Sequence, residues 1–319
     1  DRRQRQMCIR DSDNIAAVVE RSGLRACLCY EISDRNGRKT FHDSLQENLA
    51  FIESHRDQRR LQGNLGLHAN FTLSEKSMAE IAQYYDPEIG INIHCAEDKI
   101  DREYCRELGY DGPVSRLKHF GLLGKKSILA HGVHLDQAEL TEVARSGSII
   151  VHNPESNADN SVGRLNLPPA DDVSIGLGTD GMTSAMLATC CAGYLIQRQA
   201  GVADTQILNY LLQCLFKTNS TFASQLIGFQ LGQIVAGAAA DITVFDYIPV
   251  TPFNSDNIFR HIIYGMPSAR ADMVMVDGQQ IYTDGVFLTL DEELIREAAQ
   301  KASQRVWKQF AETNVLHFK

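Results

Sequence analysis

The feature that most constrains the fold is a regular alternation of short apolar runs with helical segments. Between Asp13 and Thr183, six strand-length apolar runs occupy residues 25–32, 66–71, 91–95, 127–131, 148–152 and 173–178. Most are separated by helix-like sequence, such as the predicted capping box Asp136-Gln-Ala-Glu139, whose helix Gly147 closes. Near-continuous apolar strands are typical of a sheet that is buried on both faces. The pattern therefore predicts a parallel sheet covered by helices.

Polar residues at the ends of these runs decide between two parallel architectures. His68, His94, His131, His152 and Asp180 each stand at or just past the C-terminal end of a run. A doubly wound sheet concentrates its ligands at one or two switch points, whereas a barrel gathers them from many successive strands. The sequence therefore predicts an α/β fold of the (β/α)₈ TIM-barrel type, in which two of the eight strands are missing.

The rest of the chain divides into smaller units. Helical segments at 184–200, 205–216 and 220–227 complete a partial barrel over residues 13–230. Short β segments at 241–245, 261–264 and 273–276, with the hairpin turn Asp277-Gly278 before a strand at 280–282, predict a small β-domain over 231–290. Residues 291–319 are expected to form a C-terminal helix whose apolar face, which includes Leu294 and Val306, packs against the protein.

Composition limits the partners and the compartment. The net charge is −9 and there is no basic run outside the first ten residues, so we expect no nucleic-acid binding. There is no apolar stretch long enough to span a membrane, and we expect no signal peptide because residues 1–12 are polar and lack an apolar run. The eight cysteines form no C-x-x-C pair and lie mostly in apolar segments. Because buried, unpaired cysteines are typical of a reducing compartment, we expect a cytoplasmic protein.

The first residues differ from the rest. Residues 1–12, DRRQRQMCIRDS, contain no initiator Met at position 1 and resemble translated sequencing-adapter text. We therefore expect a leader that is not part of the natural protein, with an ordinary frayed basic terminus as the alternative.

Four of the polar residues suit a metal-assisted reaction. His94 can present an imidazole nitrogen and Asp180 a carboxylate oxygen to a metal. Glu97 follows His94 by three residues and can reach over the same site as a proton shuttle, while His131 can orient a water molecule. Each residue alone has an ordinary structural explanation. Their occurrence on successive strand ends favours a metal site.

Motifs around these residues resemble the amidohydrolase superfamily. They are Ile93-His-Cys-Ala-Glu97, Ala130-His-Gly-Val-His-Leu135, Val151-His-Asn-Pro154 with Ser156-Asn157, and Leu177-Gly-Thr-Asp-Gly181. The motifs are similar to those of the branch of cytosine deaminases, guanine deaminases and chlorohydrolase-like enzymes, and most similar to SsnA-type aminohydrolases. Leu231–Asp246 resembles that branch's return from the barrel to a small β-domain.

The resemblance implies a hydrolase of exocyclic C–N bonds, in some members C–Cl bonds, on a nitrogen heterocycle. It implies that His94 and Asp180 bind one divalent metal, zinc or alternatively iron, and that metal-bound hydroxide attacks the ring carbon. Glu97 is then the acid/base that helps ammonia leave, and His131 and Asp180 handle the water. All three are expected catalytic residues.

The same resemblance implies how the substrate is held. His68, in Leu67-His-Ala-Asn70, matches the family's substrate-contacting histidine, while Asn153 and Ser156 lie in a loop that shapes the pocket. The partner is a small heterocycle, and the sequence does not separate guanine, cytosine, a triazine or a pterin. Residues 64–72 contain no lysine of the kind that hydantoinase-type amidases carboxylate, so a mononuclear site is expected. Nothing in the sequence decides whether the chain forms a homo-oligomer.

One departure from the family pattern matters. The family's first strand carries an H-x-H pair that supplies two metal ligands, and this chain contains no H-x-H. We therefore expect the first two strands to be the missing ones, together with the first part of the small domain. Because catalytic zinc usually has three protein ligands, we also expect weak metal binding and little activity. The alternative function is an inactive barrel that serves as a binding or assembly partner.

Overall fold

The centre of the molecule is a parallel sheet of five strands. The computed structural model describes residues 12–167 and 172–312, and the sheet strands follow one another in chain order. They are β3 (Leu65–Ala69), β4 (Ile91–Cys95), β5 (Ile128–His131), β6 (Ile149–His152) and β7 (Ile175–Leu177). All four pairings are parallel, so the carboxyl ends of the strands lie at one edge of the sheet. The predicted α/β fold with a central parallel sheet is confirmed.

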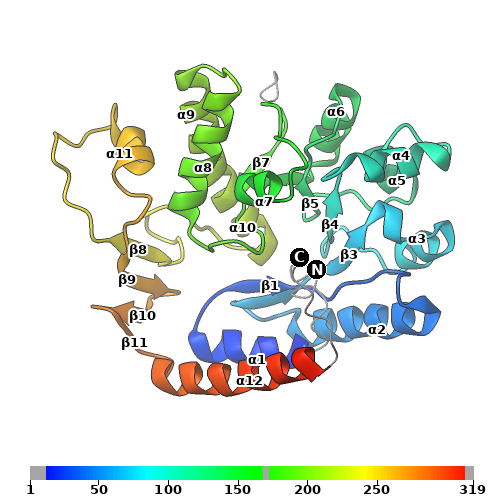
Figure 1. Ribbon diagram of the computed structural model, residues 1–319, viewed down its shortest axis with the longest axis horizontal. Helices are drawn as coiled ribbons and strands as arrows, with labels where there is room; N and C mark the ends of the chain where they lie inside the picture. Colours follow the sequence, from blue (N-terminus) through cyan, green and yellow to red (C-terminus); the bar gives the residue numbers. More distant parts are fainter. Residues whose placement is uncertain (1–11, 168–171, 313–319) are drawn as a thin grey trace.

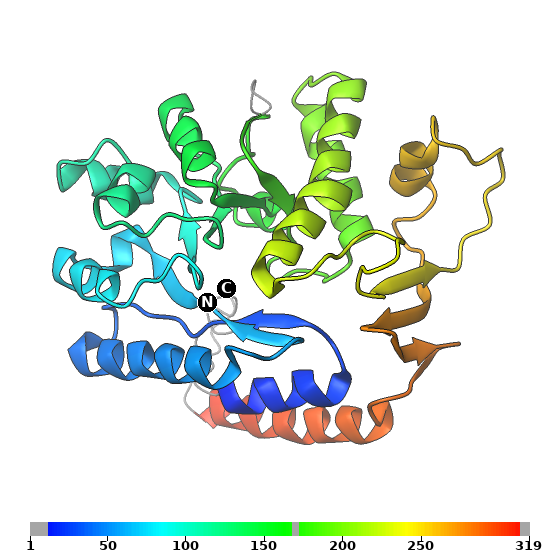
Figure 2. The same cartoon turned by 180° about the vertical axis from the view of Figure 1, so that it is seen from behind.

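Helices lie around the outside of these strands (Figures 1 and 2). They are η1 (Asn70–Thr72), α3 (Glu75–Ala82), α4 (Lys99–Glu107), α5 (Pro113–His119), α6 (Gln137–Ser146), α7 (Pro154–Asp159), α8 (Met186–Gln199), α9 (Asp204–Leu212), η2 (Gln213–Thr218) and α10 (Asn219–Ile227). The predicted capping box of α6 is present, because Asp136 and Glu139 each accept a hydrogen bond from the other's backbone N–H. Gly147 ends that helix in the left-handed conformation, with φ of 74°.

The first apolar run, residues 25–32, joins the main sheet only at its end. The N-terminal elements are α1 (Ser12–Ser22), β1 (Ala26–Leu28), α2 (Gly37–His55) and β2 (Leu61–Gly63). Strand β1 pairs with β2, and Ile32 makes an isolated parallel bridge to Leu67. Between β1 and Ile32, the buried side-chain amide of Asn48 makes hydrogen bonds to the backbone N–H and C=O of Tyr30 and to the N–H of Gly66. This side chain takes bonds that a neighbouring strand would otherwise make, so the run is interrupted.

Within the residues expected to form the small β-domain, the structure has an antiparallel sheet in the order β11-β10-β9-β8. Its strands are β8 (Ile242–Phe245), β9 (Ala271–Val276), β10 (Gln279–Thr283) and β11 (Val286–Phe287). The predicted Asp277-Gly278 turn joins β9 to β10, with φ of 52° and 78°, as a type I′ hairpin turn requires. An ion pair from Arg25 to Asp241 fastens this sheet to the N-terminal region.

The prediction of a β segment at residues 261–264 is wrong. These residues form the last turns of α11 (Ile258–Tyr264). A short apolar run fits either element, and here Ile258 and Ile262, four residues apart, both pack against the main core. A helix presents residues with that spacing on one face, so burial against the core decided the outcome.

Of the C-terminal helix expected over residues 291–319, the structure shows α12 (Glu292–Glu312), and residues 313–319 lie outside the described residues. The apolar side chains of α12 are not buried. Leu294 is 65% exposed and Val306 is 48% exposed, so the expected packing of this face is not seen. Residues 1–11 of the expected leader lie outside the described residues. Within residues 12–167 and 172–312, no helix is both long and apolar enough to cross a membrane.

Candidate active site

Three histidines stand in a row on adjacent strands at the carboxyl edge of the sheet. His68, on β3, has its ring centroid 5.3 Å from that of His94 on β4, and His94 lies 5.4 Å from His131 at the end of β5. His68 and His131 are buried. The strand register produces this row, because Ala69 pairs with His94 and Cys95 with His131.

Hydrogen bonds hold the Nδ1 atom of each of these histidines. His94 Nδ1–H donates to the backbone carbonyl oxygen of His68 at 2.7 Å, and His131 Nδ1–H donates to Oδ1 of Asn157 at 2.8 Å. His68 Nδ1 lies 3.1 Å from Oγ1 of Thr72 and must donate, because that hydroxyl gives its hydrogen to the carbonyl oxygen of Ala69. In the neutral rings Nε2 is therefore the nitrogen with the lone pair.

Two carboxylates face His131. Its Nε2 lies 3.6 Å from Oε2 of Glu97 and 3.9 Å from Oδ2 of Asp180. The side chains of Glu97 and Asp180 are 26% and 33% exposed, so solvent or a small molecule can reach them. Glu97 follows β4, and Asp180 follows β7. The structure thus brings together the residues that the sequence assigned to catalysis and to the metal.

The backbone at this edge is turned sharply. Ala96, His131 and Asp180 have φ of 50°, 76° and 50°, in the left-handed region that side chains other than glycine rarely adopt. Such conformations cost on the order of 1 kcal/mol or more each and cluster at functional sites. Here they end the strands abruptly and aim Glu97, His131 and Asp180 at one place.

Burial and neighbouring charges set the protonation of these groups. Burial lowers the pKa of His68 to about 4, and burial together with the His131 imidazole lowers that of His94. Burial alone would raise the pKa of Asp180, but the hydrogen bond from Ser156 and the nearby imidazoles lower it below the usual value. His68 and His94 are therefore neutral near pH 7, while Asp180 is ionised.

The short helix α7 contributes three polar side chains to the site. Ser156 Oγ donates to Oδ2 of Asp180 at 2.6 Å, and Asn157 accepts from His131 as described above. Asn160, which caps the helix, donates from Nδ2 to Oε1 of Glu97 at 2.9 Å and to Oγ of Ser156 at 3.4 Å. Sequence reasoning missed the roles of Asn157 and Asn160. Asn157 stood in the Ser156-Asn157 motif but was given no role, and the signal for Asn160 was its position shortly after that motif.

The other expected pocket residue, Asn153, lies against β7. It is buried, and a Cβ atom at Gly178 would come within 2.4 Å of Asn153 Oδ1. Glycine at 178 therefore lets this loop approach the strand. His152 was noted at its strand end but given no role. Its buried Nδ1 lies 3.0 Å from the hydroxyl of Tyr210, and its Nε2 has no partner among the described residues.

Buried charges behind the sheet edge fix the loops that carry the site. Asp101, on α4, accepts hydrogen bonds from the backbone N–H groups of Ala96 and Phe71, so it ties the segments that follow β4 and β3. Arg116, on α5, donates to the carbonyl oxygens of Asn70 and Leu73.

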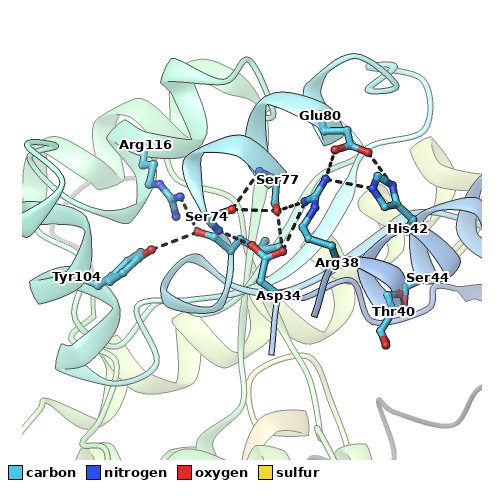
Figure 3. A network of polar contacts seen from close by, with 11 residues as sticks. Asp34, Arg38, Thr40, His42, Ser44, Ser74, Ser77, Glu80, Tyr104 and Arg116 are labelled. Atoms are coloured by element: carbon cyan, nitrogen blue, oxygen red, sulfur yellow. Dashed lines mark hydrogen bonds and ion pairs between the residues drawn. The ribbon is translucent and has the colours of Figure 1, made fainter. Parts of the chain in front are cut away.

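Figure 3 shows Arg116 beside a second polar network, which holds the loop before α2. Asp34 accepts from Ser74 N at 2.8 Å and from Ser77 Oγ at 2.7 Å, and Arg38 reaches both Ser77 and Glu80. These bonds join the start of α3 to the loop that follows Ile32. Two separate networks of hydrogen bonds therefore hold the segment between β3 and α3, one through Arg116 and one through Asp34.

The side chains gathered at this edge carry the types of atom that divalent metals bind. Zinc and iron both accept imidazole and carboxylate ligands. A histidine that binds a metal through one ring nitrogen usually donates a hydrogen bond from the other, as His94 does from Nδ1 to the carbonyl oxygen of His68. The number of ligands is smaller than a complete site needs. Within residues 12–167 and 172–312, no group of three or more His, Cys, Asp or Glu side chains is placed to hold a metal ion.

Comparison with known proteins identifies the family. The model of the amidohydrolase family matches residues 6–281. The chain belongs to the amidohydrolase family. It is a hydrolase of carbon–nitrogen bonds other than peptide bonds, as expected from the sequence motifs.

Relatives of this amidohydrolase include deaminases and a chlorohydrolase. A 5-methylthioadenosine/S-adenosylhomocysteine deaminase of Desulforudis audaxviator is 26% identical over 307 residues, covering 93% of this chain and 70% of the relative. An adenosine deaminase from Xanthomonas campestris with bound zinc has a TM-score of 0.75 at 21% identity, covering 93% and 69% of the two chains. Atrazine chlorohydrolase from Arthrobacter aurescens complexed with zinc has a TM-score of 0.70 at 19% identity, covering 91% and 68%. The expected amidohydrolase family is confirmed, the deaminase that is similar in sequence fits the expected branch, and the chlorohydrolase shares the fold.

Proposed function

We propose that this amidohydrolase is a metal-dependent deaminase that removes an exocyclic amino group from a nitrogen heterocycle. The convergence of three Nδ1-anchored histidines and two carboxylates at the ends of β3, β4, β5 and β7 carries the proposal. The relative from Desulforudis audaxviator, named as a deaminase of adenosine derivatives, supports the substrate class. Guanine, triazines and other aminated rings belong to the same class.

The residues divide the chemistry as follows. When bound, a divalent metal supplies Lewis acidity that activates water near pH 7. His94 and Asp180 would hold the metal, and zinc is favoured because two solved relatives contain it. Glu97, partly exposed beside His131, takes a proton from the attacking water and delivers it to the leaving nitrogen. His131, held by Asn157, orients the water between the two carboxylates.

Substrate binding falls to the neutral groups beside this centre. His68 is neutral near pH 7 and directs the lone pair of Nε2 away from Thr72, so it can accept a hydrogen bond from a ring N–H or an exocyclic amino group of the heterocycle. Asn153 and Ser156 limit the pocket on the side of β7.

The test is ammonia release from a panel of aminated heterocycles with zinc in excess. The panel includes 5-methylthioadenosine, guanine, cytosine and an aminotriazine. We expect slow release from at least one of them. Release from none, in a folded sample with zinc bound, would instead support the alternative of an inactive barrel that acts as a binding or assembly partner. The incomplete set of ligands among the described residues is the observation that favours this alternative.

Metal content gives a separate prediction. His94 and Asp180 are two ligands where a catalytic zinc site usually has three, so the chain should lose zinc readily. After extended dialysis we expect well under one zinc atom per chain by inductively coupled plasma analysis. One tightly held atom of zinc or iron per chain would contradict this prediction and would point to ligands beyond His94 and Asp180.

A further inference from the structure

Helix α7 is too short to be a major part of the core, yet it contacts all three groups assigned to the chemistry. Ser156, Asn157 and Asn160 hydrogen-bond Asp180, His131 and Glu97 respectively. The three partners come from separate segments, following β7, ending β5 and following β4. One rigid turn therefore sets the relative positions of groups that the sheet alone would leave independent.

Burial makes two of these contacts specific. Ser156 and Asn157 are both almost fully buried, and Asn157 meets the buried imidazole of His131. A hydrogen bond between buried polar groups fixes their orientation, because leaving either group without a hydrogen bond costs free energy. The contact between Asn160 and Glu97 is more exposed.

The chemistry of each contact suits positioning. With the amide oxygen of Asn157 toward His131, Oδ1 can only accept, so it requires a hydrogen on His131 Nδ1 and leaves Nε2 facing Glu97 and Asp180. Asn157 Nδ2 is buried and has no partner among the described residues. The Ser156 hydroxyl donates to one oxygen of Asp180, and the backbone N–H of Gly181 donates to the other at 2.7 Å. The carboxylate is thereby fixed at both oxygens.

We propose that α7 is the positioning element of the site: Asn157 selects the tautomer of His131, Ser156 orients Asp180 and Asn160 holds Glu97. This inference builds on the proposed function and replaces the substrate contact expected of Ser156 with an indirect role. Ser156 and Asn157 act through their partners and need not touch the heterocycle.

The first experiment observes the tautomer of His131 without metal or substrate. In ¹⁵N-histidine-labelled protein, long-range ¹⁵N–¹H correlation spectra show which ring nitrogen carries hydrogen, and loss of a signal in His131→Gln assigns it. We expect Nδ1–H in the starting protein and in Asn157→Asp, which keeps an acceptor. Asn157→Leu should shift His131 toward the Nε2–H tautomer. An Nδ1–H form that persists in folded Asn157→Leu overturns the proposal.

The second experiment measures zinc affinity and covers the case in which Asn157→Leu does not fold. Ser156→Ala should weaken zinc binding about 10-fold, within the range seen when groups that orient metal ligands are removed. Ser156→Thr keeps the hydroxyl and should retain the affinity. Ala158→Ser, at an exposed position of the same helix, is the matched control. Equal affinities for Ser156→Ala and Ser156→Thr would contradict the proposal.

The two readouts separate this inference from the proposed function. If the protein neither binds zinc nor releases ammonia, the proposed function fails, but the tautomer experiment still decides whether Asn157 positions His131. If ammonia is released and the tautomer is unchanged in folded Asn157→Leu, the function stands and the positioning role of α7 fails.

Discussion

Replacing Glu97 with Gln should lower kcat for ammonia release about 100- to 10,000-fold, the range typical for loss of a general acid/base. Gln keeps the size of the side chain and its contact with Asn160, but it cannot take up and return a proton. Because Glu97 is not an expected metal ligand, zinc affinity and the thermal unfolding temperature should change little. The measurement is steady-state kinetics on the best substrate of the panel, with zinc in excess.

The control for this variant is Glu103→Gln. Glu103 lies on the exposed side of α4, so the same chemical change there should leave kcat within about twofold. Activity retained in Glu97→Gln would remove Glu97 from the mechanism. A large fall in both variants would point to a general effect of charge rather than to proton transfer.

Replacing Arg116 with Met should lower the free energy of unfolding by about 3 kcal/mol, since breaking a buried charged network is strongly destabilising. Arg116 is 0% exposed and makes hydrogen bonds of 2.7 Å to the carbonyl oxygens of Asn70 and Leu73, and one of 2.9 Å to Glu75. Met fills similar space but donates no hydrogen bond, so both carbonyl oxygens lose their shortest hydrogen bond and keep only the longer ones from Leu73 N–H at 3.2 Å and Tyr104 O–H at 3.5 Å. Urea unfolding followed by circular dichroism measures the change.

Arg106→Met is the matched control for Arg116→Met. Arg106 lies on α4 at the surface, and within the described part of the chain its guanidinium makes one long, exposed contact of 3.4 Å to the carbonyl oxygen of Asp111. Its replacement should change the free energy of unfolding by no more than about 0.5 kcal/mol. Equal urea midpoints for the two variants would show that the network around Asn70 and Leu73 does not depend on Arg116.

Local patterns in the sequence predicted the elements that carry the site. The strands around His94 and His131 were placed within one residue, because short apolar runs between helical segments are a local signal. The capping box at Asp136 and the turn at Asp277-Gly278 were also correct. These features depend on contacts between residues only a few positions apart, which a single sequence displays directly.

Other features depended on contacts that no local pattern records. Residues 261–264 are helical because Ile258 and Ile262 pack against the core, and strand β2 forms because Leu61 pairs with Ala26. Arg116 could not be identified as a buried arginine, because its acceptors lie 46 and 43 positions away in the chain.

The sequence by itself determined the parallel α/β fold, the family, and the identity of the catalytic candidates His94, Glu97, His131 and Asp180. Only the tertiary structure decided how those groups are held. The contacts from α7 to Asp180, His131 and Glu97 join residues 24, 26 and 63 positions apart. Such distances are set by the register of parallel strands and by the sharp turns at their ends, which no spacing along the chain encodes.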